Sequence, residues 1–194
     1  MRILAIDPGP EQSAWVIYDS DAHALLDFHI DDNADLSSRI HMKGSPCDPS
    51  CRSFRVVPSH IAVEMIASYG MAVSKSIFDT CVWIGRFIEE WGARKYERQA
   101  DARGIDRWID LGNGSLLFRK EIVKHLCGSS HAKDSNVRQA VLDRFPASGG
   151  GKTPQVGTKD QPGPLYGVSK DLWSAIAVAL CYADQFCKVE AVRE

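Results

Sequence analysis

The first third of the chain is patterned as short apolar runs separated by polar turns. Residues 3–6 are four apolar residues in succession, too few for a helix, and Asp7 follows them directly before a Pro-Gly pair. Residues 13–19 are rich in β-branched and aromatic side chains, and residues 24–30 form a third apolar stretch. Short apolar runs bounded by Pro and Gly are typical of buried strands. The pattern therefore predicts a three-stranded meander with Asp7 at the end of its first strand.

The rest of the chain alternates between strand and helix patterns. Residues 60–66 form an apolar run interrupted by Glu64, which predicts a fourth buried strand. Over residues 72–96 apolar side chains recur at three- and four-residue spacing, predicting a long amphipathic helix, and residues 107–111 predict a short fifth strand. Three further helices are predicted over residues 115–126, 134–145 and 170–187. This order predicts an α/β fold with a mixed five-stranded sheet flanked by helices.

Two polar segments interrupt these patterns. Residues 31–59 carry several turn signals, and we interpret them as an irregular excursion with a short helix near residues 36–41. Residues 146–168 hold six of the 15 glycines and four of the nine prolines, which predicts a loop. A length of 194 residues suits one substantial core, so we expect a single domain over residues 1–194.

Composition narrows the class of protein. Apolar residues make up 44% of the chain and charged residues 25%, as in globular proteins, and no apolar run has the length of a membrane span or the pattern of a signal peptide. We therefore expect an intracellular protein that does not enter membranes and keeps its six cysteines reduced. The net charge of −2 gives no global attraction to nucleic acid, so any DNA contact requires a local basic patch.

Three acidic residues occupy positions that favour a common site. Parallel strands would place Asp7 and Glu64 at neighbouring carboxyl ends, and Asp171 falls in the first turn of the last predicted helix. Clustered carboxylates repel one another, and a fold tolerates them mainly when cations neutralise them. Mg²⁺ prefers such ligands, and two ions about 3.5–4 Å apart can activate a water and stabilise the leaving oxygen of a phosphodiester. Individually, each acid also has an ordinary structural interpretation as a turn, strand-edge or helix-start residue.

Motifs in chain order resemble the RuvC family of Holliday junction resolvases, within the RNase H-like superfamily. They are Ile-Asp-Pro-Gly at residues 6–9, the apolar strand ending in Val63-Glu64, and the run beginning Asp-Leu-Trp-Ser at residue 171. Residues 132–138 are similar to the family's Lys-x-x-Val helix start, and the loop over residues 157–167 resembles its phage-associated branch. The resemblance covers nearly the whole chain.

The resemblance implies an RNase H-like fold and a Mg²⁺-dependent endodeoxyribonuclease that cleaves Holliday junctions and other branched DNA. It implies Asp7, Glu64 and Asp171 as catalytic metal ligands, two Mg²⁺ ions with Mn²⁺ as an alternative, a homodimer, and the cytoplasm of a bacterial or phage-infected cell. The family usually supplies a fourth acid one helical turn after the third, where this chain has Ser174. Either a water molecule or an approaching Asp134 or Asp160 then completes the ligand set, or catalysis is weakened. This departure from the family pattern affects the expectation of a second metal ion and not that of the fold.

Basic residues near the predicted site are candidates for DNA contacts, since phosphate contacts by Lys and Arg dominate affinity. These residues are Lys120, Lys124, Lys133, Arg138, Lys152, Lys159 and Lys170. Tyr69, just past the Glu64 strand, could stack on a base or wedge into the branch point, although a core or helix-start role is the more usual one for such a tyrosine.

Other functions compete with the nuclease. Ser174 in place of an acid favours a non-catalytic junction-binding protein, and an RNase H-type nuclease acting on RNA–DNA hybrids would use the same acids. Residues 149–153 resemble the end of a phosphate-binding P-loop, but Pro146 stands where the first glycine is required and Pro154 follows. A zinc site from His41, Cys47, Cys51 and His60 matches known spacings poorly.

Overall fold

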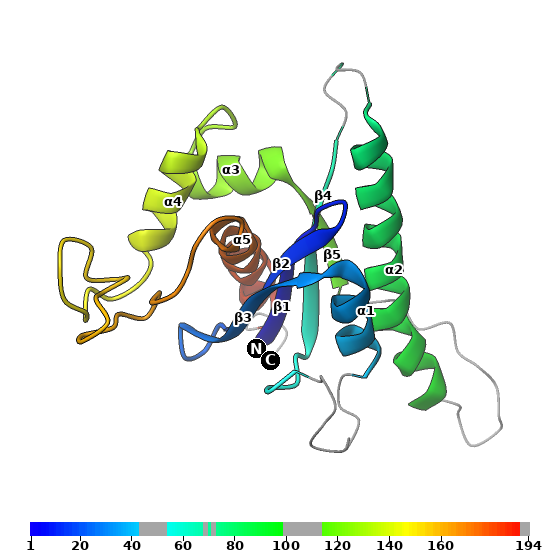
Figure 1. The fold of residues 1–194 in the computed structure, drawn as a ribbon, viewed down its shortest axis with the longest axis horizontal. Helices are drawn as coiled ribbons and strands as arrows, with labels where there is room; N and C mark the ends of the chain where they lie inside the picture. The colour runs from blue at the N-terminus through cyan, green and yellow to red at the C-terminus, as the bar shows by residue number, and fades with distance from the viewer. Residues whose placement is uncertain (43–53, 68–69, 71–72, 99–113, 191–194) are drawn as a thin grey trace.

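The computed structural model describes residues 1–42, 54–67, 70, 73–98 and 114–190 (Figure 1). In these ranges the strands are β1 (Arg2–Asp7), β2 (Gln12–Asp19), β3 (Ala24–Asp32), β4 (His60–Met65) and β5 (Gly114–Phe118). The helices there are α1 (Asn33–His41), α2 (Lys75–Arg98), α3 (Arg119–Cys127), α4 (Asp134–Leu142) and α5 (Leu172–Glu190). The predicted α/β fold with a mixed five-stranded sheet flanked by helices is confirmed.

The sheet has the order β3-β2-β1-β4-β5. β1 pairs antiparallel with β2 and parallel with β4, and α2 provides the crossover from β4 to its parallel neighbour β5. Ile6 lies beside Val63 in the β1–β4 pairing, so the next residues, Asp7 and Glu64, lie at adjacent carboxyl ends. The juxtaposition of these two acids that the strand order predicted is therefore present.

Helices cover both faces of the sheet, with α3, α4 and α5 on one side and α1 and α2 on the other (Figure 1). Alternate residues of β1 enter different cores because successive side chains of a strand point to opposite faces. Ala5 packs with α5 in one core, whereas Leu4 and Ile6 pack with α1 and α2 in the other. Burial on both faces explains why residues 3–6 are continuously apolar.

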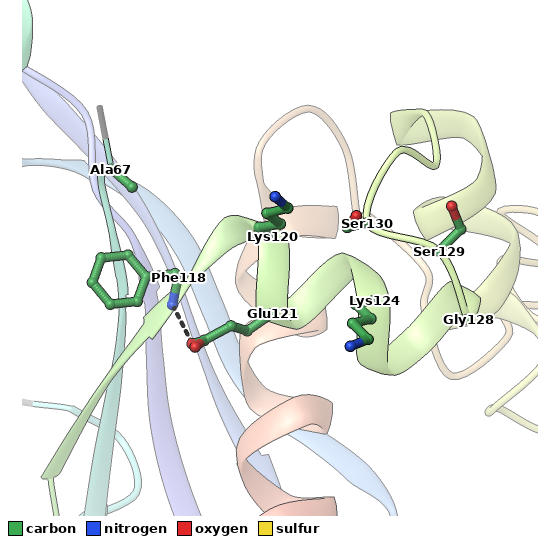
Figure 2. A pocket seen from close by; sticks show the side chains of 8 residues that line it. All are labelled: Ala67, Phe118, Lys120, Glu121, Lys124, Gly128, Ser129 and Ser130. Atoms are coloured by element: carbon green, nitrogen blue, oxygen red, sulfur yellow. Dashed lines mark hydrogen bonds between the residues drawn. The ribbon is translucent and has the colours of Figure 1, made fainter. Parts of the chain in front are cut away.

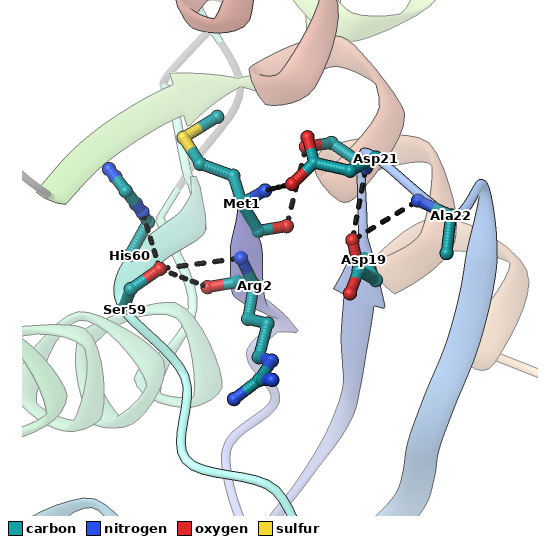
Figure 3. A network of polar contacts seen from close by, with 8 residues as sticks. Met1, Arg2, Asp19, Asp21, Ala22, Ser59 and His60 are labelled. Atoms are coloured by element: carbon teal, nitrogen blue, oxygen red, sulfur yellow. Dashed lines mark hydrogen bonds and ion pairs between the residues drawn. The ribbon is translucent and has the colours of Figure 1, made fainter.

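The amino end of β1 is tied to both neighbouring segments (Figure 3). The amino group of Met1 contacts Asp21 Oδ2 at 2.6 Å, in the turn after β2. On the other side, the Ser59 hydroxyl donates to the Arg2 carbonyl at 3.1 Å and accepts from the Arg2 N–H at 3.3 Å. These contacts support the register of β1 at the end opposite Asp7, so the position of that acid is defined along the strand.

The first part of the segment over residues 31–59 is more regular than predicted, and residues 43–53 lie outside the described residues. Asp31 and Asp32 complete β3, and α1 begins at Asn33 instead of near residue 36. The reason is pairing with β2, in which Asp31 lies opposite Ser13 and Asp32 opposite Gln12. Asp31 also accepts a hydrogen bond from the Trp15 indole at 2.9 Å, which compensates for its poor intrinsic strand propensity.

The start of the third predicted helix is also wrong. Residues 114–118 form β5, and α3 begins only at Arg119, whereas a helix was predicted from residue 115. Pairing of Ser115 with Ala62 and of Phe118 with Met65 imposes the strand. The strand predicted at residues 107–111 lies outside the described residues.

Helix ends differ from the predictions by a few residues elsewhere. α2 begins at Lys75, and α4 ends at Leu142 because tight turns follow, with the N–H groups of Arg144 and Phe145 bonded three residues back. α5 begins at Leu172 and extends to Glu190. Gly128 ends α3 as predicted, with φ of 73° and its N–H bonded to the Lys124 carbonyl at 3.0 Å.

The predicted loop over residues 146–168 is held by backbone hydrogen bonds. Gly149 N–H donates to the Pro154 carbonyl at 2.8 Å, and Gly163 N–H donates to the Val156 carbonyl at 3.0 Å. A Cβ on Gly149 would lie 2.7 Å from backbone atoms of Gly157 and Gly163. The loop segments that contain these three glycines therefore approach too closely to leave room for a side chain at residue 149. No strand precedes residues 149–154 and no helix follows them within this loop, which argues against a P-loop.

Two remaining expectations concern cysteines and membranes. Cys81, Cys127 and Cys181 are free thiols, while Cys47 and Cys51 lie outside the described residues. Among the helices that the structure describes, none combines the length and apolar character needed to cross a membrane.

Candidate active site

The turn after Asp7 is fixed by a buried polar cluster. The Ser13 hydroxyl donates to Asn33 Oδ1 at 2.5 Å, and Asn33 Nδ2 donates to the Gly9 carbonyl at 2.9 Å. Gly9 N–H in turn donates to Ser13 Oγ at 3.3 Å. Ser13 and Asn33 are both 1% exposed, so each needs these partners. The cluster joins β2 and α1 to the turn and thereby positions the carboxyl end of β1.

Asn33→Ala is expected to lower the free energy of unfolding by about 1–3 kcal/mol, because Ser13 and the Gly9 carbonyl lose a buried partner. Urea denaturation followed by circular dichroism measures this change. Ser38→Ala, which removes an exposed hydroxyl bonded within α1, is the control and should change stability by less than about 0.5 kcal/mol. Equal urea midpoints for Asn33→Ala and the wild type would contradict the assigned role.

Asp7 and Glu64 are partly buried acids whose ionisation is unfavourable in the protein alone. The pKa of Asp7 is raised from 3.8 to about 7, mainly by burial and also by the negative charges of Glu64 and Asp171, while Arg119 and the Ser174 hydroxyl partly oppose the rise. Burial also raises the pKa of Glu64, against the attraction of Arg119. Neighbouring acids that resist ionisation without a cation are the arrangement expected of metal ligands.

Arg119, which the sequence analysis did not single out, lies at the centre of the site. Its Nη1 donates to Ser174 Oγ at 3.0 Å and lies 3.4 Å from Glu64 Oε2, while Nη2 donates to Asp134 Oδ1 at 2.6 Å. It is the first residue of α3, directly after β5, so it stands at the carboxyl end of the strand next to Glu64. A helix over residues 115–126 would place Arg119 in a helix interior, whereas the end of β5 at Phe118 places it at a strand end.

The two remaining predicted site residues lie at the start of α5. Asp171 belongs to the turn immediately before α5, not to its first turn, and its charge reaches Asp7. Ser174 lies in the first turn of α5 and accepts the hydrogen bond from Arg119. Two acids were considered as a fourth ligand. Asp134 accepts a hydrogen bond from Arg119, which in turn contacts Glu64, whereas Asp160 is exposed in the loop over residues 146–168.

The donors at this site suit a hard divalent cation. Asp7, Glu64 and Asp171 provide carboxylate oxygens, the ligands that Mg²⁺ and Mn²⁺ prefer. Within the described ranges, however, no three His, Cys, Asp or Glu side chains are gathered closely enough to hold a metal ion as they stand. Ser174 adds only a hydroxyl that already accepts from Arg119, so the residues fit one cation on the Asp7 side better than two.

Two of the predicted DNA-contacting lysines line a cavity at the start of α3 (Figure 2). Lys120 and Lys124, both from α3, border a cavity of about 660 Å³ together with the ring of Phe118, the side chain of Glu121 and the α3–α4 connection. Glu121 also accepts a hydrogen bond from the Phe118 N–H at 3.2 Å, which defines the start of α3. A second cavity of about 390 Å³ is lined by Arg119, Lys120 and His131, among others, so Lys120 and the arginine that contacts Glu64 border the same space.

The other predicted DNA-contacting residues are more scattered. Lys133 precedes α4, where its N–H donates to Asn136 Oδ1, and the Arg138 guanidinium lies over the Trp173 ring at 4.8 Å. Lys159 is exposed in the loop, and Lys170 is exposed in the turn before α5 with φ of 49°. Tyr69 lies outside the described residues. The structure therefore gathers Lys120 and Lys124 around one cavity, and Lys120 also borders the cavity that Arg119 lines.

No protein-family model matches the sequence, and no curated protein matches it by sequence. Among solved structures the chain is similar to Thermus thermophilus RuvC, with a TM-score of 0.56 and 16% identity over 95% of this chain and 96% of that one. It is also similar to T. thermophilus RuvC in complex with Holliday junction substrate, with a TM-score of 0.55 and 16% identity over 94% of this chain and 93% of that one. The sheet order, the flanking helices and this similarity together identify the chain's fold as the RuvC-like, RNase H-like fold.

Proposed function

We propose that the protein is a metal-dependent, structure-selective endonuclease that cleaves phosphodiester bonds in Holliday junctions and other branched DNA. The observation that carries this proposal is the pairing of Asp7 and Glu64, two partly buried acids, at the carboxyl ends of adjacent parallel strands. The RuvC-like fold supports it, since one structure with this fold is RuvC in complex with Holliday junction substrate.

In this mechanism Asp7, Glu64 and Asp171 hold the catalytic cation with their carboxylates. A Mg²⁺ or Mn²⁺ ion bound there would supply a water of lowered pKa as the nucleophile and positive charge for the leaving oxygen. Lys120 and Lys124 hold the phosphates of the DNA in the adjoining cavity. Asp7 has to be ionised for this role, so we expect cation binding to strengthen as the pH rises through about 7.

The test compares purified protein on four labelled substrates: a four-way junction, a replication fork, a linear duplex and an RNA–DNA hybrid. Each is incubated with Mg²⁺, with Mn²⁺ or with EDTA. We expect metal-dependent nicking confined to branched DNA. Cutting of the hybrid alone would support the RNase H-type alternative. Tight junction binding without nicking in any metal would support the non-catalytic alternative, which Ser174 favours.

Lys120→Ala and Lys124→Ala are expected to weaken binding to all branched DNA sequences about equally. Each lost phosphate contact should reduce the slope of log affinity against log salt by about 0.9, so the double variant should lose about two. Fluorescence anisotropy at several salt concentrations measures the slope. Arg2→Ala is the control, because Arg2 is exposed at the opposite end of β1. An unchanged slope in the double variant would show that Lys120 and Lys124 do not contact DNA phosphates.

We further propose that the protein acts as a homodimer, since two-fold symmetry suits a four-way junction. Phe78 and Val82 lie one turn apart on α2 and are 61% and 57% exposed, an apolar patch that a second copy could cover. Phe78→Lys should convert the dimer to a monomer in light scattering, whereas Val57→Lys, at a similarly exposed valine, should not. A wild-type monomer at micromolar concentration would contradict the proposal.

We infer that the protein works in the cytoplasm of a bacterial or phage-infected cell, where branched DNA arises. The resemblance of residues 157–167 to the phage-associated branch of resolvases supports the second setting.

A further inference from the structure

We infer that Arg119 supplies, from within the protein, the positive charge that a second divalent cation would otherwise supply, so that each chain binds one divalent ion. The inference rests on the proposed nuclease activity and departs from the expectation of two Mg²⁺ ions. It is carried by the contacts of one guanidinium group with three site residues.

The guanidinium of Arg119 joins three elements around the acids. Nη1 lies between Glu64 of β4 and Ser174 of α5, and Nη2 bonds to Asp134 at the start of α4. The Glu64 side chain is only 13% exposed, so this charge contact lies at the edge of the protein interior. A guanidinium remains charged at any physiological pH and presents several donors in one plane, so it can neutralise an acidic cluster permanently.

The same contacts leave little place for a second cation. Ser174 is a neutral ligand, and its oxygen already accepts a hydrogen bond from Arg119. A cation bound between Ser174 and Glu64 would lie next to the guanidinium and be repelled by it. Asp7, by contrast, faces the negative charges of Glu64 and Asp171, which favours one cation on that side of the cluster.

Arg119 also lies where a substrate phosphate would enter. It lines the cavity of about 390 Å³ together with Lys120 and His131, so its side chain borders both the acids and the open space beside them. A phosphodiester in that cavity would meet the fixed positive charge of Arg119. Preorganised charge at this position stabilises the negative charge that develops on phosphate oxygens in the transition state.

The experiment counts bound Mn²⁺ by electron paramagnetic resonance during titration of the full chain. We expect one ion per chain for the wild type and for Arg119→Lys, which keeps the charge. The double variant Arg119→Ala with Ser174→Asp removes the charge and adds a carboxylate, so it should bind two. Two ions in the wild type, or one ion in a double variant with a wild-type circular dichroism spectrum, would overturn the inference.

Thermal melting provides a second readout. In EDTA, Arg119→Ala should melt below the wild type because Glu64 loses its charge partner, and saturating Mn²⁺ should raise its melting temperature by more than that of the wild type. Arg144→Ala is the matched control. Arg144 forms an ion pair with Asp184 at a distance of 2.8 Å, and neither residue belongs to the site. The Arg144→Ala variant should be less stable than the wild type, but it should bind the same number of Mn²⁺ ions and show the same rise in melting temperature when Mn²⁺ is added. An equal gain for Arg119→Ala and the wild type would overturn the inference.

These outcomes separate the inference from the proposed function. Two bound ions together with metal-dependent nicking would overturn the single-ion inference and leave the nuclease in place. Absence of any bound ion, together with absence of nicking, would overturn the proposed function and the inference with it.

Discussion

Asp7→Asn is expected to abolish metal-dependent cleavage of branched DNA and, at the same time, to stabilise the metal-free protein at pH 8. Removing a ligand of the catalytic cation costs several kcal/mol of transition-state stabilisation, which corresponds to a rate loss of about 10³-fold or more. The gain in stability has a separate cause, because the partly buried Asp7 carboxylate is unfavourable when it is ionised and uncompensated.

The sign of the stability effect follows from the pKa of Asp7, which burial raises from 3.8 to about 7. Between these values the folded protein holds a proton that the unfolded chain has lost, so the wild type loses stability as the pH rises from about 4 to 7, and the loss is complete above 7. At about 1.4 kcal/mol per pKa unit the penalty is on the order of a few kcal/mol. Asparagine does not ionise and avoids this penalty.

The two effects are measured on the same preparations by junction cleavage in Mg²⁺ and by melting in EDTA between pH 4 and 9. The melting temperature of Asp7→Asn should exceed that of the wild type by several degrees at pH 8, at about 2–4 °C per kcal/mol, and the difference should shrink toward pH 4. Asp143→Asn, at an exposed acid at the end of α4, should change neither property. Cleavage by Asp7→Asn at the wild-type rate would show that Asp7 is not a catalytic residue. Equal melting curves at pH 8 would show that burial of the ionised Asp7 does not destabilise the protein.

The acids of the site were predictable because their positions follow from local pattern. Residues 3–6 are apolar on both faces of a strand, and Asp7 is the first polar residue after them, so its place at the strand end depends on few long-range contacts. Glu64 breaks a second such run. Parallel pairing then brings both acids to one edge of the sheet, where α/β folds place their sites.

Arg119 could not be predicted from local pattern. The run from Ser115 to Lys124 contains apolar and charged residues at spacings that suit a helix, and only pairing with β4, a strand about 50 residues earlier, makes its first part a strand. Ser174 illustrates the same limit. In the sequence, Ser174 occupies the position at which the resolvase family usually has a fourth acid. In the structure, its hydroxyl accepts a hydrogen bond from Arg119. Non-local contacts therefore decide the electrostatics of the site.

Trp15→Ala is expected to lower the free energy of unfolding by about 3–5 kcal/mol, a large part of the 5–15 kcal/mol typical of a domain. The indole is 1% exposed, contacts the Phe54 ring edge-on at a centroid distance of 5.1 Å, and lies opposite Ile6 in the β1–β2 pairing. Its N–H donates to Asp31 Oδ2 at 2.9 Å, so truncation leaves a cavity and removes one contact of a carboxylate oxygen that keeps its ion pair with Arg39 at 2.9 Å.

Trp15→Phe separates these two contributions. It keeps most of the apolar volume and removes the N–H, so we expect a smaller loss of about 1–2 kcal/mol in urea denaturation. Trp83→Ala, at a partly buried indole on α2, should cost less than Trp15→Ala because less of that ring is removed from water. Because Ile6 directly precedes Asp7, the loosened β1–β2 pairing in Trp15→Ala should also reduce cleavage under conditions where the variant remains folded. Full cleavage by a folded Trp15→Ala variant would mean that the Gly9, Ser13 and Asn33 cluster alone suffices to position Asp7.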